Sequence, residues 1–134
     1  MSNRSVGTGF EREFCGILAK HGFWAHNMAQ KAEGQPADVV AAKDGTAFLI
    51  DCKVCEKDCF RLDRVEENQE LAMGKWLACG NFGAYFAIKM LNTGEIFMVP
   101  FQDIRGMRLR NVKSLKRKDL IMYTTLEMWM RNRQ

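Results

Sequence analysis

The chain has 134 residues, of which 47% are hydrophobic and 27% are charged, and its formal net charge is +4. These values are typical of one folded domain that buries its own core. No apolar run approaches the ~20 residues that a membrane-spanning helix requires, and no apolar segment follows the N-terminus as in a signal peptide. We therefore expect a single domain over residues 1–134 that works in the cytoplasm, away from membranes.

The five cysteines are expected to be free thiols, because their number is odd and nothing marks the chain as secreted. Cys52, Cys55 and Cys59 do resemble a cluster of zinc ligands. A structural zinc ion needs about four ligands, and Cys79 or His26 would have to complete the set. We prefer the simpler interpretation, in which the cysteines are small buried hydrophobic residues.

The first half of the chain predicts a helix over residues 7–21 and a weak strand over residues 23–28. Apolar residues and one histidine recur at helical spacing on one face of the helix, namely Phe10, Phe14, Ile17, Leu18 and His21. Gly22 ends this helix. Two further strands, residues 38–42 and 47–54, are joined by a turn with Asp44-Gly45 at its centre and form a hairpin.

The second half predicts a helix over residues 64–79, closed by Gly80, and a hairpin of residues 84–90 and 95–99. The buried face of that helix is formed by Val65, Ala72, Met73, Trp76 and Cys79. One short helical turn is expected within residues 101–107. Thr124 and Glu127 have the spacing of a capping box, which would begin a C-terminal helix at about residues 124–133. The order of elements predicts an α/β domain with a central mixed sheet flanked by helices.

The most informative motif is Asp51-Cys52-Lys53. Side chains alternate along a strand, so Asp51 and Lys53 share one face while Cys52 joins Phe48 and Ile50 on the other. An ordinary ion pair on a solvated face is the alternative interpretation, and such pairs contribute little to stability.

Asp38 favours a functional interpretation of this motif. Antiparallel pairing across Asp44-Gly45 sets position 38 opposite position 51, so two carboxylates meet at one end of the hairpin. Like charges destabilise a sheet unless something neutralises them, and carboxylate oxygens with retained waters are what Mg²⁺ prefers. The pattern therefore predicts a divalent cation between Asp38 and Asp51.

Two further polar residues are candidates for the same site. Glu11 lies on the border of the buried face of the first helix; Glu13, on the other border, is the competing choice, and we prefer Glu11. Gln69 falls within the apolar face of the second predicted helix. It is either a core glutamine with satisfied hydrogen bonds or a residue that reaches a polar site near Lys53.

Positive charge is concentrated in residues 105–118, which carry +7 and contain no acidic residue. Such a stretch is typical of a protein that binds phosphates, although a solvated surface loop would look the same. Its basic residues are Arg105, Arg108, Arg110, Lys113, Lys116, Arg117 and Lys118. Other residues that could contact phosphates, or could equally be solvated, flank the predicted site, namely Gln30, Lys31, Lys57, Arg61 and Arg64.

Several of these segments together resemble the PD-(D/E)XK nuclease superfamily, and within it the Holliday junction resolvases. The segments GTGFEREF (7–14), LAKHGF (18–23), PADVV (36–40) and LIDCK (49–53) are similar to the opening helix and metal-binding strands of the archaeal-type enzymes. The segments RVEENQ (64–69), IFMVP (96–100) and FQDI (101–104) are similar to the RecU-type enzymes. The likeness runs in order over about residues 7–104.

The resemblance implies a restriction-endonuclease-like core and a homodimer that resolves four-way DNA junctions by metal-dependent phosphodiester hydrolysis. By position, the catalytic residues would be Glu11, Asp38, Asp51 and Lys53, supported by Gln69. The metal would be Mg²⁺, with Mn²⁺ as a substitute. The backbone carbonyl of Cys52 would join the three carboxylates as a ligand.

Two other functions stay open from the sequence alone. One is a restriction-like or repair nuclease of the same superfamily. The other is a catalytically silent module that binds nucleic acid, which the complete set of acidic residues and Lys53 argues against, because such a cluster without a metal would only destabilise the fold.

Overall fold

A mixed sheet of six strands forms the centre of the computed structural model, which describes residues 3–28 and 37–132. The strand order is β1-β2-β3-β5-β6-β8, and β3 and β5 are parallel while the other neighbours are antiparallel. The strands are β1 (Trp24–Asn27), β2 (Val39–Lys43), β3 (Thr46–Cys55), β5 (Gly83–Met90), β6 (Ile96–Pro100) and β8 (Thr124–Thr125).

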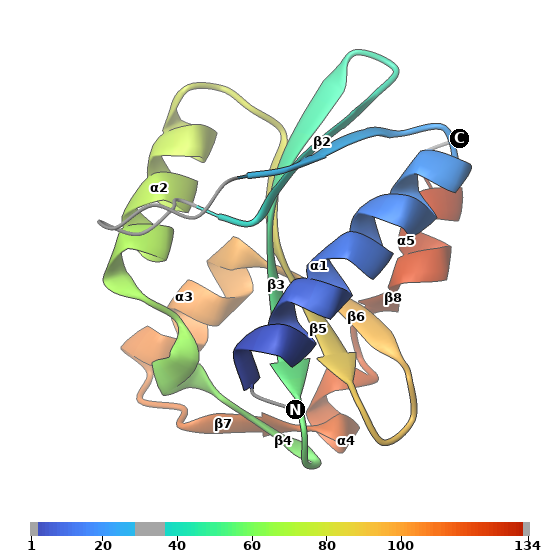
Figure 1. Cartoon of the computed structure of the whole chain (residues 1–134). Coiled ribbons are helices and arrows are strands. Elements are labelled where there is room, and N and C mark those ends of the chain that lie inside the picture. The colour runs from blue at the N-terminus through green and yellow to red at the C-terminus, as the bar shows by residue number, and fades with distance from the viewer. Residues whose placement is uncertain (1–2, 29–36, 133–134) are drawn as a thin grey trace.

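Helices cover both faces of this sheet, as Figure 1 shows. Helix α1 (Asn3–Lys20) and helix α5 (Leu126–Arg131) lie on one side. Helix α2 (Glu67–Ala78) and helix α3 (Phe101–Leu109) lie on the other. The predicted α/β class with a mixed sheet flanked by helices is therefore confirmed. Among the described residues, no helix is long and apolar enough to span a membrane.

Helix α1 begins at Asn3, before the predicted residue 7, and ends where Gly22 adopts a φ of +85°. Phe10, Phe14 and Leu18 are buried against the sheet. His21 was wrongly assigned to the buried face, because it follows the helix, is exposed, and its ring Nδ1 lies 2.8 Å from the carbonyl of Ile17.

The β2–β3 hairpin has the predicted register, since Val39 pairs with Ile50 and the same midpoint sets position 38 opposite position 51. Its turn contains Asp44 and Gly45 with φ values of 51° and 80°, the left-handed conformations that a tight hairpin turn requires. Helices cover both faces of β3, so the alternative of a solvated face for Asp51 is wrong. The Asp51 side chain is completely buried.

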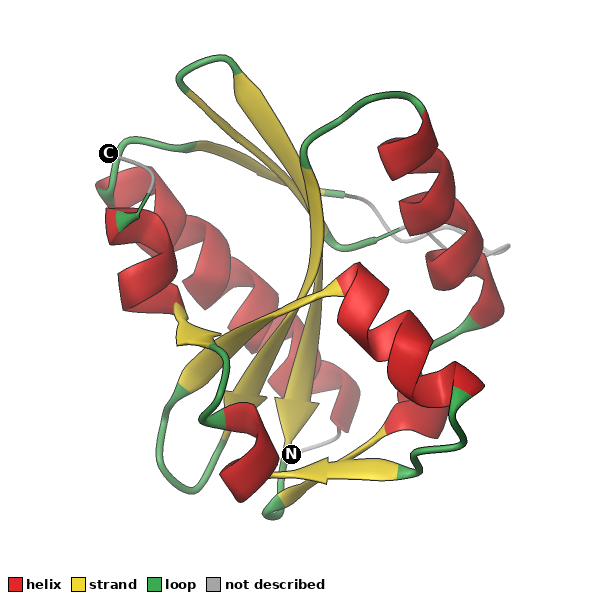
Figure 2. Cartoon of the chain, turned by 180° about the vertical axis from the view of Figure 1, so that it is seen from behind, coloured by secondary structure: helices red, strands yellow, loops and turns green. Residues whose placement is uncertain are grey.

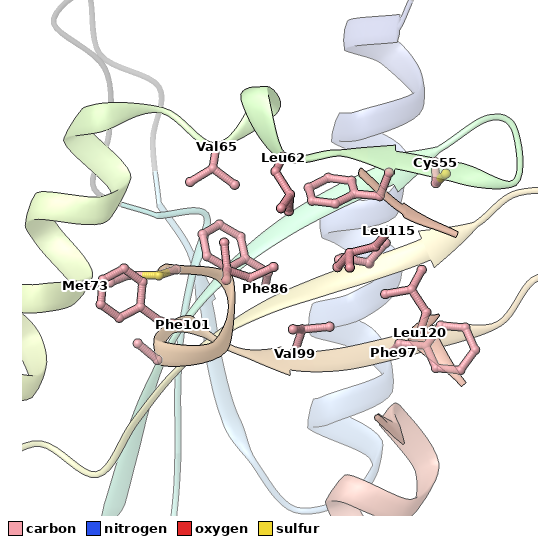
Figure 3. Packing of buried hydrophobic residues seen from close by; sticks show 14 of the residues in the cluster. Cys55, Leu62, Val65, Met73, Phe86, Phe97, Val99, Phe101, Leu115 and Leu120 are labelled. Atoms are coloured by element: carbon pink, nitrogen blue, oxygen red, sulfur yellow. The ribbon is translucent and has the colours of Figure 1, made fainter. Parts of the chain in front are cut away.

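The two apolar cores lie on opposite faces of the sheet. The core beneath α2 and α3 contains Met73, Phe86 and Phe101, which point toward one another in Figure 3. In the core beneath α1 and α5, the Trp129 ring packs against Phe23 and Phe48 at centroid distances of 5.6 and 5.0 Å. Burial of such rings is the main source of stability for a domain of this size.

The second half differs from the prediction in several places. Helix α2 begins at Glu67 after a single 3-10 turn, η1 (Leu62–Arg64), and Cys79 is exposed rather than on the buried face. Gly80, at a φ of +89°, closes the helix as expected. Helix α3 has nine residues instead of one short turn. The N-cap of α5 is Thr125 rather than Thr124, because the Thr125 hydroxyl accepts the hydrogen bond from the backbone N–H of Met128.

The basic segment is also not a single loop. It contains the end of α3, strand β7 (Ser114–Lys116) and the start of helix α4 (Arg117–Leu120). Strand β7 pairs with β4 (Cys59–Arg61) in a separate small sheet at the bottom of the view in Figure 2. Both strands have three residues, which is too short for an alternation of polar and apolar residues to reveal them.

All five cysteines are free thiols. Cys52 and Cys55 are buried, in agreement with the prediction, whereas Cys59 and Cys79 are exposed. The interpretation of every cysteine as a buried hydrophobic residue was therefore too broad.

Candidate active site

Acidic side chains gather where β2 begins and one edge of β3 loses its neighbour. Strand β2 pairs with β3 only as far as Ile50, so the next residues of β3 have no strand on this side. Asp38 takes the place of the missing strand, because its Oδ2 accepts a hydrogen bond of 2.7 Å from the backbone N–H of Cys52. The Asp38 carboxylate is thereby fixed at the open edge of the sheet and is itself buried.

Asp51 lies next to Asp38 on the face that α2 covers. Its Oδ1 accepts a hydrogen bond of 3.0 Å from Gln69 Nε2, and its Oδ2 lies 3.2 Å from Lys53 Nζ. Desolvation by burial, and then the charge of Asp38, raise the pKa of Asp51 well above its usual value, although Lys53 opposes this effect. A carboxylate held in this way attracts positive charge strongly.

Gln69 is positioned by the N-terminus of α2. Its Oε1 accepts a hydrogen bond of 3.1 Å from the backbone N–H of Glu66, which is half of a capping box. The amide nitrogen therefore points to Asp51, as the second interpretation of this residue required. The Gln69 amide is buried, but its oxygen and its nitrogen each have a hydrogen-bond partner.

Of the two candidate glutamates in α1, the structure brings Glu11 to the cluster. Burial, followed by the charge of Asp38 and a hydrogen bond with it, raises the pKa of Glu11 from 4.5 to about 7. Glu13 instead forms an ion pair of 2.6 Å with Lys89. The sequence did not indicate Asn27, the last residue of β1, whose side chain hydrogen-bonds Glu11. An asparagine in a strand was the available signal, since this residue is uncommon there.

An open pocket of about 660 Å³ lies in front of these groups. Glu11, Asp38, Lys53 and Gln69 contribute to its wall, and the Lys53 side chain is 13% exposed. Helices α1 and α2 flank the strand that carries Lys53 (Figure 1). The pocket is thus accessible from solvent and has side chains of both charges in its wall.

Basic residues line the outer part of the pocket. Lys57, Arg61 and Arg64 are exposed and belong to its wall. Arg64 also supports the fold, because its guanidinium donates a 2.6 Å hydrogen bond to the carbonyl of Val54 and lies 5.5 Å from the centre of the Phe60 ring. Gln30 and Lys31 lie outside the described residues.

The pairing of β7 with β4 brings part of the basic segment beside the pocket. Lys116 is opposite Cys59, a pocket residue, and Lys113 lines a neighbouring hollow together with Arg61. Lys113, Lys116, Lys118, Arg105 and Arg110 are exposed.

Two members of the basic segment are already paired. Arg108 forms an ion pair with Glu70, and Arg117 contacts both carboxylate oxygens of Glu95 at 2.7 and 2.9 Å. These two side chains are therefore less available to phosphates than the other basic residues of the segment.

The acidic residues fit a hard divalent cation held in an open site. Within residues 3–28 and 37–132, no three His, Cys, Asp or Glu side chains surround one point as the ligands of a closed cage would. Mg²⁺, however, commonly takes one or two carboxylates and keeps several waters. Asp51 Oδ2 is buried and, beyond its ion pair with Lys53, has no hydrogen-bond partner among the described residues. Burial, followed by the charge of Asp38, raises the pKa values of both Asp51 and Glu11, and a bound cation would offset both effects.

Comparison with known proteins identifies the family. A family model described as archaeal Holliday junction resolvase (Hjc) matches residues 2–129. The chain belongs to this resolvase family. The resemblance expected from the sequence is therefore confirmed, and so, at the level of the family, is the function of an endonuclease that resolves Holliday junctions.

A solved structure supports the same fold. The resolvase chain is similar to Hjc of Archaeoglobus fulgidus, a Holliday junction resolvase from an archaeal hyperthermophile, with a TM-score of 0.70 and 19% sequence identity. The match covers 92% of this chain and 97% of that one. No curated protein sequence matches the chain. The roles of individual residues in this resolvase stay predictions.

Proposed function

We propose that this resolvase hydrolyses one phosphodiester bond of a four-way DNA junction in the pocket between α1 and α2. Glu11, Asp38, Asp51 and Lys53 would be the catalytic residues, and Gln69 would position Asp51. The observation that carries this proposal is the Asp51 carboxylate, which is completely buried yet held between Gln69 Nε2 and Lys53 Nζ beside Asp38. A structural role alone gives no reason to keep these like charges together.

The metal in this proposal is Mg²⁺, with Mn²⁺ as a substitute. Its ligands would be the carboxylates of Glu11, Asp38 and Asp51 and the backbone carbonyl of Cys52. The N–H and C=O groups of one strand residue point to the same side, and the N–H of Cys52 points to Asp38 at the open edge. A divalent cation bound there would acidify a water molecule and polarise the scissile phosphate.

The remaining residues have distinct roles in the proposal. Lys53 orients the attacking water or stabilises the charge that develops on the phosphate, because its ammonium group lies at the floor of the pocket. Gln69 holds Oδ1 of Asp51 in a hydrogen bond, so that Oδ2 of Asp51 faces Lys53. Asp38 remains oriented by its hydrogen bond to the backbone of Cys52.

The DNA backbone would be held by the basic residues around the pocket. The most available are Lys57 and Lys113, followed by Lys116 and Lys118. Arg61 is exposed at the pocket but already forms an ion pair of 2.7 Å with Asp63. We also propose a homodimer in the cytoplasm, because two symmetrical cuts in one junction require two active sites.

A cleavage assay tests the proposal. Purified protein with Mg²⁺ is offered a synthetic four-way junction, a linear duplex and a single strand, with Asp51→Asn as the inactive control. We expect paired symmetrical nicks in the junction only, and an Asp51→Asn variant that binds without cutting. Cleavage of all three DNAs would instead support the restriction-like or repair nuclease. A fully active Asp51→Asn variant would overturn the site.

A further inference from the structure

Strand β1, at the edge of the sheet, presents two aromatic side chains to solvent. Trp24 is 62% exposed, although an indole ring is normally largely buried. Its ring stacks on the imidazole of His26, with ring centres 5.8 Å apart and an angle of 15° between the planes. The two rings therefore form a small exposed stack, called the aromatic stack below.

The backbone holds this stack in place. Trp24 and His26 are two residues apart on one strand, so both project from the same side of β1. Strand β1 pairs with β2 through Trp24 opposite Ala42 and His26 opposite Val40. The imidazole supports the indole, and much of the indole surface remains available to a further flat group.

Strand β1 leads from the aromatic stack to the candidate active site. Asn27 follows His26 in the strand and hydrogen-bonds Glu11 from the opposite face of β1. The backbone N–H of Met28 then donates a 2.8 Å hydrogen bond to the carbonyl of Asp38. At ~3.3 Å per residue, Trp24 lies ~13 Å along the strand from Met28. This distance corresponds to about four base-pair steps of 3.4 Å, so DNA held in the pocket can reach the stack.

We propose that the aromatic stack receives an unstacked base of the junction close to the strand that is cut. This inference rests on the proposed function of the pocket and adds a contact to the bases. Every base has a flat face, so stacking on Trp24 is tolerant of sequence. A stacked base would add a contact that an ordinary duplex does not offer, because the bases of a duplex are already stacked on one another.

Tryptophan fluorescence tests the contact directly, because the chain has only three tryptophans. Trp129 is 3% exposed, and Trp76 is partly buried with its Nε1 donating to the carbonyl of Gly83. A synthetic four-way junction is added in EDTA, so that it is bound without being cut. We expect quenching of the wild-type emission and loss of that quenching in Trp24→Phe. Equal quenching in both proteins would overturn the inference.

Binding affinity provides the second test, with Phe82→Ala as a matched control. Phe82 is an 80% exposed aromatic residue that follows α2. We expect Trp24→Ala to raise the Kd for the junction about 10-fold, with Trp24→Phe in between and Phe82→Ala unchanged. The dependence of Kd on salt should keep its slope, because stacking releases no counterions. An unchanged Kd for Trp24→Ala would overturn the inference.

Two further measurements distinguish a base-stacking role of Trp24 from a role in protein association. Light scattering reports the oligomeric state, and a loss of dimer in Trp24→Ala would overturn the inference by making the stack a contact between protein copies. Cleavage of the junction by the wild-type protein with Mg²⁺ reports the proposed function independently. A protein that cuts the junction but shows no effect of Trp24 would keep the proposed function and lose only the aromatic stack.

Discussion

Replacing Asp51 with asparagine should stabilise the protein when no metal is present. The substitution keeps the shape of the side chain and an oxygen that can accept the hydrogen bond from Gln69. It removes a charge that is completely buried beside Asp38 and only partly balanced by Lys53. A buried ion costs several kcal/mol to desolvate, and pairing recovers part of this, so we expect a net gain of about 2 kcal/mol.

This gain in the free energy of unfolding can be expressed as a shift in melting temperature. An unfolding entropy of ~2.1 cal/mol/K per residue gives ~0.28 kcal/mol/K for the whole chain, so about 2 kcal/mol corresponds to ~7 °C. The pKa of Asp51 is raised by folding, so its carboxyl group destabilises the fold only when it is ionised. The advantage of Asp51→Asn should therefore be largest at alkaline pH and disappear as pH falls below the ordinary aspartate pKa of 3.8.

Mg²⁺ should remove most of this difference in stability. With a Kd of about 1 mM, 10 mM Mg²⁺ would add ~1.4 kcal/mol to the wild type, or ~5 °C, and little to the variant. Differential scanning calorimetry in EDTA and in Mg²⁺ measures both effects, with Glu13→Gln as the control because Glu13 pairs with Lys89 outside the site. If Asp51→Asn melts below the wild type in EDTA, the Lys53 ion pair outweighs desolvation and our reasoning is refuted.

Three further predictions concern Glu11, Gln69 and the basic segment. The metal-free protein should lose stability as pH rises from 4.5 to about 7, because folding raises the pKa of Glu11 over this interval. After allowance for solvent screening, the loss is about 1 kcal/mol. Urea titrations should show a smaller loss of stability over this pH range in Glu11→Gln than in the wild type. Gln69→Ala should lower the free energy of unfolding by about 1–3 kcal/mol, because it leaves Asp51 Oδ1 and the backbone N–H of Glu66 without partners; an unchanged stability would argue against both hydrogen bonds. Lys118→Ala should weaken junction binding and reduce the salt slope by about 0.9, whereas Arg117→Ala should change the slope less because Arg117 is paired with Glu95; equal slopes in these two variants would contradict this difference.

The local parts of the site follow from the sequence. The turn at Asp44-Gly45 specifies the register of the hairpin, because both residues accept left-handed conformations, and this register places positions 38 and 51 together. Alternation along the strand then puts Lys53 on the same face as Asp51. These features depend on residues that are close in the chain, so a pattern of residue types contains the necessary information.

Contacts between distant parts of the chain decided the burial and the partners of the site residues. Whether Asp51 is solvated or buried depends on helix α2, which covers its face and supplies Gln69 from 18 residues further along the chain. The pairing of β4 with β7, and the ion pairs of Arg108 and Arg117 with distant glutamates, determine which of the described basic residues lie beside the pocket without an acidic partner. The sequence determined which chemical groups are present and how neighbours are oriented. Their burial and their partners were decided by tertiary packing, because these properties depend on surfaces that meet only in the folded chain.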